Sequence, residues 1–119
     1  QLRTYRLAVA ATNEYAVAVG GNTVAGTLAA QVLIMNRVNG VYERDVAIRM
    51  VIVANNDLIV FTAEPDGYTN TSGSTMLGEN TTILTAAIGT ANYDIGHVFS
   101  TGGGGVAYPL RHACTCSAP

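Results

Sequence analysis

The chain has 119 residues, a length suited to one domain, and with 49% hydrophobic and 12% charged residues it lacks the composition of a disordered protein. Its net charge is −2 and its basic residues are six arginines with no lysine, so we expect no nucleic-acid partner. The longest apolar runs, residues 7–11 and 50–54, are far shorter than the ~20 residues of a membrane-spanning helix, and we expect no membrane partner.

The first predicted element is a strand over residues 3–11, which alternates at first and then becomes continuously apolar before Asn13. Such a run is typical of a strand that is covered on both faces. A turn follows at residues 20–23, where Asn22 or Thr23 could accept a hydrogen bond from the first free amides of a helix.

The next predicted element is an amphipathic helix over residues 24–42. Its apolar side chains recur at three- and four-residue steps, which places them on one helical face. These side chains are Val24, Leu28, Val32, Met35, Val38 and Tyr42.

A second strand is predicted over residues 47–54, which are mostly apolar and rich in β-branched side chains. Strand, helix and strand in this order form a βαβ unit, whose crossover is right-handed in nearly all proteins and makes the two strands parallel. The sequence therefore predicts an α/β fold with a mostly parallel, twisted sheet.

The second half of the chain contains weaker patterns. Residues 58–62 are a short apolar piece that either extends the second strand or forms a flap, and residues 64–73 form a surface loop rich in turn formers. A second helix is predicted over 75–89, with Gly89 ending it in a left-handed cap, and a third strand over 95–100. A glycine turn at 101–105 then leads into a further extended run.

The residues alone predict no catalytic or metal site. The glycine runs do not fit GxGxxG, and no lysine is present for a phosphate-binding loop. No GxSxG surrounds a serine. A zinc site would have to combine His97, His112, Cys114, Cys116 or a carboxylate, but two cysteines one residue apart fit no structural zinc pattern, and we expect no metal ligand in this chain. We interpret His97 as a hydrogen-bonded structural residue.

Other polar residues are also interpreted as structural. The acidic residues are dispersed along the chain and are read as solvated or capping groups. Two triplets, beginning at Asn70 and Asn80, fit the glycosylation sequon of exported eukaryotic proteins.

Two blocks of sequence resemble a known family. The segment 32–53, an asparagine-punctuated helix that runs through an acidic turn into an apolar strand, resembles the first helix and following strand of reprolysin-like metzincin zinc metallopeptidases. The segment 91–107 is similar to the third strand, glycine turn and antiparallel edge strand of that family. The resemblance covers about residues 1–107 and is closest to a bacterial branch of secreted enzymes.

The resemblance implies an α/β catalytic domain with a five-stranded twisted sheet and a secreted or extracellular location. An antiparallel edge strand that begins near Gly104 would bind the substrate peptide by strand addition, so that Gly104, Gly105, Val106 and Ala107 are the expected substrate-binding residues. In the family, zinc is held by a later helix with the motif HExxHxxGxxH. That motif is absent from these 119 residues, so no catalytic residue or zinc ligand is expected here.

The family pattern is expected to end near residue 107. We therefore divide the chain into residues 1–107, the N-terminal part of a metallopeptidase catalytic domain, and residues 108–119, an aberrant or disordered tail, and we interpret the chain as an inactive fragment of a secreted zinc-dependent endopeptidase. The alternative is a noncatalytic structural module that assembles with itself through an exposed sheet edge. A small nucleotide-binding α/β domain ranks last.

Overall fold

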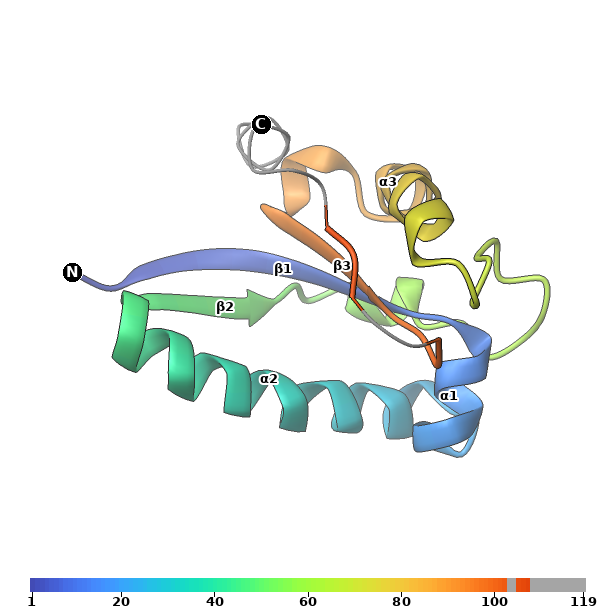
Figure 1. The fold of residues 1–119 in the computed structure, drawn as a ribbon, viewed down its shortest axis with the longest axis horizontal. Helices are drawn as coiled ribbons and strands as arrows, with labels where there is room; N and C mark the ends of the chain where they lie inside the picture. Colours follow the sequence, from blue (N-terminus) through green and yellow to red (C-terminus); the bar gives the residue numbers. More distant parts are fainter. Residues whose placement is uncertain (103–104, 108–119) are drawn as a thin grey trace.

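The computed structural model describes residues 1–102 and 105–107 and has three layers (Figure 1). A sheet of three strands lies between helix α2 (Val24–Val46) on one face and helix α3 (Gly73–Ala87) on the other. A short helix, α1 (Asn13–Gly20), lies at the carboxyl end of the first strand. The predicted α/β fold is confirmed.

The sheet is parallel throughout, with strand order β2-β1-β3. β1 (Arg3–Ala11) is central and pairs with β2 (Ile48–Ile52) along its first half and with β3 (Ile95–Phe99) along its second half. The pairing shifts from one neighbour to the other at Leu7, which is opposite Ile52 on one side and Ile95 on the other. This offset leaves the carboxyl half of β1 without β2 beside it.

Helix α1 was not predicted. Thr12, which follows β1, accepts a hydrogen bond from the amide of Tyr15 at 3.2 Å and so caps the helix, and Gly21 ends it in a left-handed conformation with φ 61°. Both capping signals were present in the sequence. Because the apolar run before Thr12 predicts a strand, Thr12 itself was not recognised as a helix cap.

Helix α2 begins where the sequence predicted, since Thr23 accepts a hydrogen bond from the amide of Gly26 at 3.0 Å. Its buried face differs from the predicted one. Met35 and Val38 contact the sheet as expected, whereas Val32 and Tyr42 are exposed. The fully buried residues of the first half are polar, Thr27 and Gln31.

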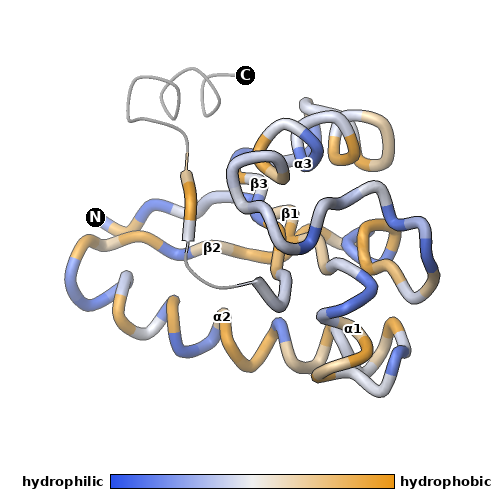
Figure 2. Tube along the Cα trace, turned by 45° about the vertical axis from the view of Figure 1, so that its right-hand side comes forward, coloured by the Kyte–Doolittle hydropathy of each residue, from blue (hydrophilic) through white to orange (hydrophobic). Residues whose placement is uncertain are grey.

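Gln31 explains this difference. Its Nε2 atom donates to the carbonyl oxygens of Val9 and Ala10 at 3.3 and 3.2 Å, so a buried polar side chain replaces an apolar contact against the sheet. The hydropathy colouring accordingly shows hydrophilic residues among the hydrophobic ones along α2, while β2 is largely hydrophobic (Figure 2).

The opposite face of the sheet forms the larger core. Ala8 and Ala10 of β1 are fully buried against α3, where Leu84 is 1% exposed. The small side chains of β1 let α3 approach the sheet closely. Other buried residues of this cluster are Ile59, Tyr68, Met76 and Ile88.

The segment 58–62 returns to β1 instead of forming a flap. A 3-10 turn (Asn56–Ile59) buries Ile59 completely, and Val60 then forms a parallel bridge with Ala11. The strand predicted over 95–100 is confirmed as β3, and the helix predicted over 75–89 as α3. The predicted left-handed cap at Gly89 is wrong: Ile88 is the capping residue of α3, and Gly89 follows it with φ 87° and ψ 136°, outside the left-handed helical region.

The antiparallel edge strand that we expected near Gly104 does not form in the described residues. Residues 105–107 have no regular secondary structure, and Gly104 lies outside the described residues, as does the predicted tail 108–119. By length and composition, no helix of the described part could cross a membrane alone; α1 and α2 pass that test only as a pair, which bends by 82° at the break between them.

Candidate functional site

The glycine turn that precedes the predicted substrate segment is anchored by one side chain. The Asn70 amide donates to Thr101 Oγ1 at 2.7 Å, and its oxygen accepts from the Thr101 backbone amide at 3.2 Å and from Thr12 Oγ1 at 3.0 Å. Three segments that are far apart in sequence therefore meet at Asn70. This residue fixes the start of the turn relative to the end of β1.

The predicted substrate-binding residues that the structure describes lie beside the start of α3. Gly105, Val106 and Ala107 are exposed, and Val106 is close enough to Gly73 that a β-carbon on that glycine would be 2.9 Å from Val106 Cγ2. Gly104 lies outside the described residues. The assignment of these four residues to substrate binding stays a prediction.

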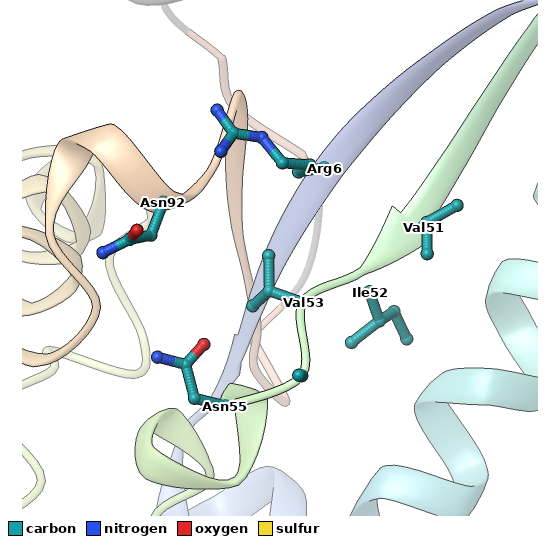
Figure 3. Close-up of a pocket in the computed structure, with 7 residues that line it drawn as sticks. Arg6, Val51, Ile52, Val53, Asn55 and Asn92 are labelled. Atoms are coloured by element: carbon teal, nitrogen blue, oxygen red, sulfur yellow. The ribbon is translucent and has the colours of Figure 1, made fainter.

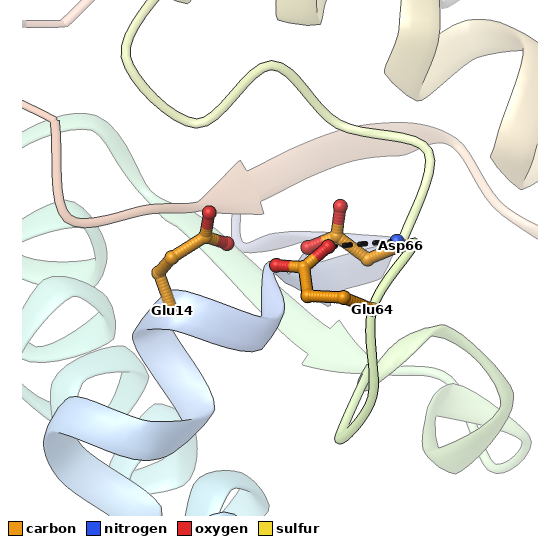
Figure 4. A group of neighbouring side chains, drawn as sticks. All are labelled: Glu14, Glu64 and Asp66. Atoms are coloured by element: carbon orange, nitrogen blue, oxygen red, sulfur yellow. Dashed lines mark hydrogen bonds between the residues drawn. The ribbon is translucent and has the colours of Figure 1, made fainter.

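Three carboxylates come together at the carboxyl end of β1 (Figure 4). Glu14 extends from the first turn of α1, and Glu64 and Asp66 come from the loop after the 3-10 turn. One oxygen of each carboxylate lies within 4.8 Å of an oxygen of each of the others. We call Glu14, Glu64 and Asp66 the carboxylate group.

Asp66 is the buried member and holds the loop in place. Its side chain accepts hydrogen bonds from the backbone amides of Asn13 at 2.7 Å and Tyr68 at 2.9 Å. The Asp66 amide itself donates to Glu64 Oε2 at 3.2 Å. Asp66 therefore joins the loop to the first residue of α1 and brings the other two carboxylates together.

This arrangement raises the pKa of Glu14. A hydrogen bond from its own backbone amide favours the charged form, but partial burial and the neighbouring Asp66 and Glu64 carboxylates outweigh that bond. One Glu14 oxygen, Oε1, is buried and has no hydrogen-bond partner among the described residues. The group has oxygen ligands of the type that Ca²⁺ or Mg²⁺ prefers, and acidic groups of this kind also occur without a cation.

The raised pKa predicts that Glu14→Gln stabilises the protein at pH 7. A raised folded-state pKa means that Glu14 contributes stability below its unfolded pKa, and this contribution is lost as the pH rises through the folded pKa. Because the group is partly solvated, we expect a gain below ~1 kcal/mol at pH 7 that disappears near pH 4. Urea denaturation at both pH values measures it.

Asp57→Asn, which removes an exposed carboxylate outside the group, is the control. It should not reproduce the gain. Equal stability of Glu14→Gln and the unchanged protein at every pH would show that the three carboxylates do not repel one another appreciably.

His97 does not have the hydrogen bond that we predicted for it. No bond joins its side chain to another described residue; its ring lies edge-on to Phe99 with the centroids 5.1 Å apart. Burial lowers the pKa of His97, although part of the residue's surface is exposed. His112, Cys114 and Cys116 lie outside the described residues.

The described part of the chain does not fit a catalytic zinc site. Such sites use three protein ligands, commonly histidines, around an open position. His97 is the sole histidine in residues 1–102 and 105–107, and the carboxylate group offers oxygen atoms only. We therefore derive no reaction step through zinc from these residues.

An open hollow of about 580 Å³ lies near the end of β2 (Figure 3). Two of its polar side chains already have partners: the Arg6 guanidinium bonds both oxygens of Asp94 at 2.8 and 3.2 Å and the carbonyl of Ala91 at 3.0 Å, and Asn92 donates to the carbonyl of Ile88. The third is the neutral amide of Asn55. None of the described residues that line the hollow is a nucleophile or a general base. These lining residues therefore support no catalytic assignment.

The two sequons are poor acceptors in this fold. Asn80 is 7% exposed and accepts a hydrogen bond from the Tyr68 hydroxyl at 2.6 Å. Asn70 is occupied by Thr12 and Thr101, as described above. Asn80 is thus buried on a helix, whereas Asn70 is half-buried in a turn with its amide already bonded.

Comparison with known proteins identifies a family. A family model described as "Metallo-peptidase family M12B Reprolysin-like" matches residues 28–118, which is more than half of the chain. The matched range includes most of α2, all of β2, α3 and β3, and the glycine turn. No curated protein and no solved structure matches the chain.

Proposed function

Because this chain belongs to the reprolysin-like M12B metallopeptidase family, we propose that it is the N-terminal part of the catalytic domain of a secreted zinc-dependent endopeptidase. The observation that carries the proposal is the position of the match. It spans both blocks of sequence that resemble metzincins, the helix and strand at 32–53 and the strand and glycine turn at 91–107.

In this proposal the chain supplies the scaffold of the active site and does not perform the chemistry. The histidines of an HExxHxxGxxH helix outside these residues would hold the zinc ion. The bound zinc would supply polarisation of the peptide carbonyl and activation of a water molecule. Since the 119 residues have no HExxH, the chain alone is proposed to be inactive and to bind no catalytic zinc.

The contribution of the chain to substrate binding would come from its sheet and glycine turn. Asn70 links the turn to the end of β1, and the turn leads into residues 104–107. An extended peptide would pair with this segment through main-chain hydrogen bonds, which select an extended backbone more than a particular side chain. The partner is therefore a peptide or protein substrate of the full-length enzyme.

Two experiments test the proposal. Sequencing the locus beyond codon 107 should find HExxHxxGxxH in one reading frame, and a chain extended through that motif should hydrolyse a generic peptide and lose this activity with a zinc chelator. The 119-residue chain, assayed with added zinc, should show no hydrolysis. Absence of the motif from every downstream frame, combined with ordered oligomers of the 119-residue chain, would instead favour the noncatalytic assembly module.

A further inference from the structure

The side-chain amide of Asn39 bonds the backbone of β2 as a neighbouring strand would. Asn39 Oδ1 accepts from the Met50 amide at 2.9 Å, and Asn39 Nδ2 donates to the Met50 carbonyl at 2.8 Å. Asn39 lies on α2, and both residues are half-buried. One side chain thus satisfies both backbone groups of the central residue of β2.

These backbone groups face the outer edge of the sheet. The hydrogen bonds from the Arg3 amide to the Ala47 carbonyl and from the Val53 amide to the Leu7 carbonyl show that the odd-numbered residues of this strand face β1. Backbone groups alternate in direction along a strand, so those of Ile48, Met50 and Ile52 face outward. A strand added at this edge would have to bond the outward backbone groups of all three residues, and those of the middle residue, Met50, already bond Asn39.

The same side of the sheet is closed further along in a similar way. Beyond the end of β2, Asn56 bonds the Val9 amide at 2.7 Å and the Val9 carbonyl at 2.9 Å. The next outward carbonyl of β1, that of Ala11, accepts from the Phe61 amide at 3.1 Å. Side-chain amides therefore take the place of a neighbouring strand at two positions on this side of the sheet: Asn39 beside Met50 and Asn56 beside Val9.

The edge formed by β3 lacks such a closure in the described residues. The Phe99 carbonyl accepts a hydrogen bond from the Thr12 amide, so the odd residues of β3 face β1 and the backbone groups of Gly96 and Val98 face away. No hydrogen bond joins those outward groups to another residue within 1–102 or 105–107. The two edges of the sheet thus differ.

We propose that Asn39 closes the β2 edge to an added strand, and in particular to the β2 strand of a second copy of this chain. A parallel sheet with an open edge exposes a row of unpaired donors and acceptors, which is a template for pairing with another chain. The closure of the β2 edge also restricts a substrate peptide to the β3 side of the sheet. This second consequence rests on the proposed function.

Hydrogen exchange of the 119-residue chain, read at single amides by NMR, tests the proposal. In the unchanged protein, exchange at Ile48, Met50 and Ile52 should not depend on protein concentration. In Asn39→Ala, the Met50 amide should exchange roughly tenfold faster in dilute solution, because it loses its acceptor. Its exchange, and that of Ile48 and Ile52, should then slow as the concentration rises and a second copy pairs with the edge.

The matched control is Asn36→Ala, which removes an exposed asparagine one turn earlier on α2. It should behave as the unchanged protein does. Asn39→Leu, which removes both hydrogen bonds but keeps the side-chain size and a strong helix former, decides the question if Asn39→Ala does not fold.

Two results would overturn the inference. Unchanged Met50 exchange in Asn39→Ala would mean that the amide pair does not protect the strand. Fast Met50 exchange with no dependence on concentration would mean that the open edge attracts no second copy. Neither result depends on peptide hydrolysis, so failure of the proposed function leaves the edge closure to be judged separately.

Discussion

Asn56→Ala should lower the free energy of unfolding by about 2–4 kcal/mol. Asn56 is 2% exposed and bonds both the amide and the carbonyl of Val9, which is itself fully buried in the central strand. Removing the side chain leaves the Val9 amide without an acceptor, while its carbonyl keeps only the longer bond from Gln31. Water cannot replace the lost partner unless the core opens.

Urea denaturation followed by circular dichroism measures this loss. Asn55→Ala is the matched control, because the preceding asparagine lies at the start of the same turn without a side-chain capping bond. We expect a change within about 0.5 kcal/mol for this control. Similar values for the two variants would contradict the role assigned to Asn56.

Leu84→Ala should cost a similar or larger amount, about 2–5 kcal/mol. Leu84 is 1% exposed and lies between α3 and the sheet, where the small residues of β1 leave no larger side chain to fill the space. Thermal and urea unfolding measure the loss. Leu33→Ala is the control, since Leu33 is 60% exposed on α2, and it should change the stability little.

Gly96 offers a second test of the same contact. A β-carbon at Gly96 would lie 2.5 Å from Leu84 Cδ1, so Gly96→Ala alone should destabilise the protein by overpacking. In the double variant with Leu84→Ala, the added methyl group enters the vacated space, and its cost should shrink or reverse. Additive effects would mean that β3 and α3 do not contact each other at these residues.

The strands and the long helix could be predicted because their signals are local. Thr23 caps α2 by a hydrogen bond within its own first turn, and the apolar run before Asn13 identifies the central strand. The order of these elements then fixed the parallel pairing. Local chemistry and tertiary structure agree at these positions.

The buried face of α2 could not be predicted in the same way. Periodicity counts apolar side chains, and Gln31 is polar, yet it is fully buried because two carbonyls of β1 lie within its reach. The role of Asn39 was hidden for the same reason. The asparagine pattern of this helix was a reason for the family resemblance, but its contact with Met50 depends on how the helix packs against the strand.

The carboxylate group also escaped prediction. Glu14 is fifty residues before Glu64, and only the return of the chain past the 3-10 turn brings them together. The turn-forming residues around Asp66 predicted a surface loop, whereas Asp66 is buried and bonds the first amide of α1. No sequence spacing distinguishes such a carboxylate from a solvated one.

The fold and the site proposals depend on a parallel sheet with β1 in the centre. Cross-strand nuclear Overhauser effects measure this arrangement most directly. We expect contacts that place Tyr5 opposite Met50 and Val9 opposite His97, together with a continuous helical pattern through Val24–Val46. Antiparallel contacts between these strands, or a non-helical pattern in that segment, would contradict the account.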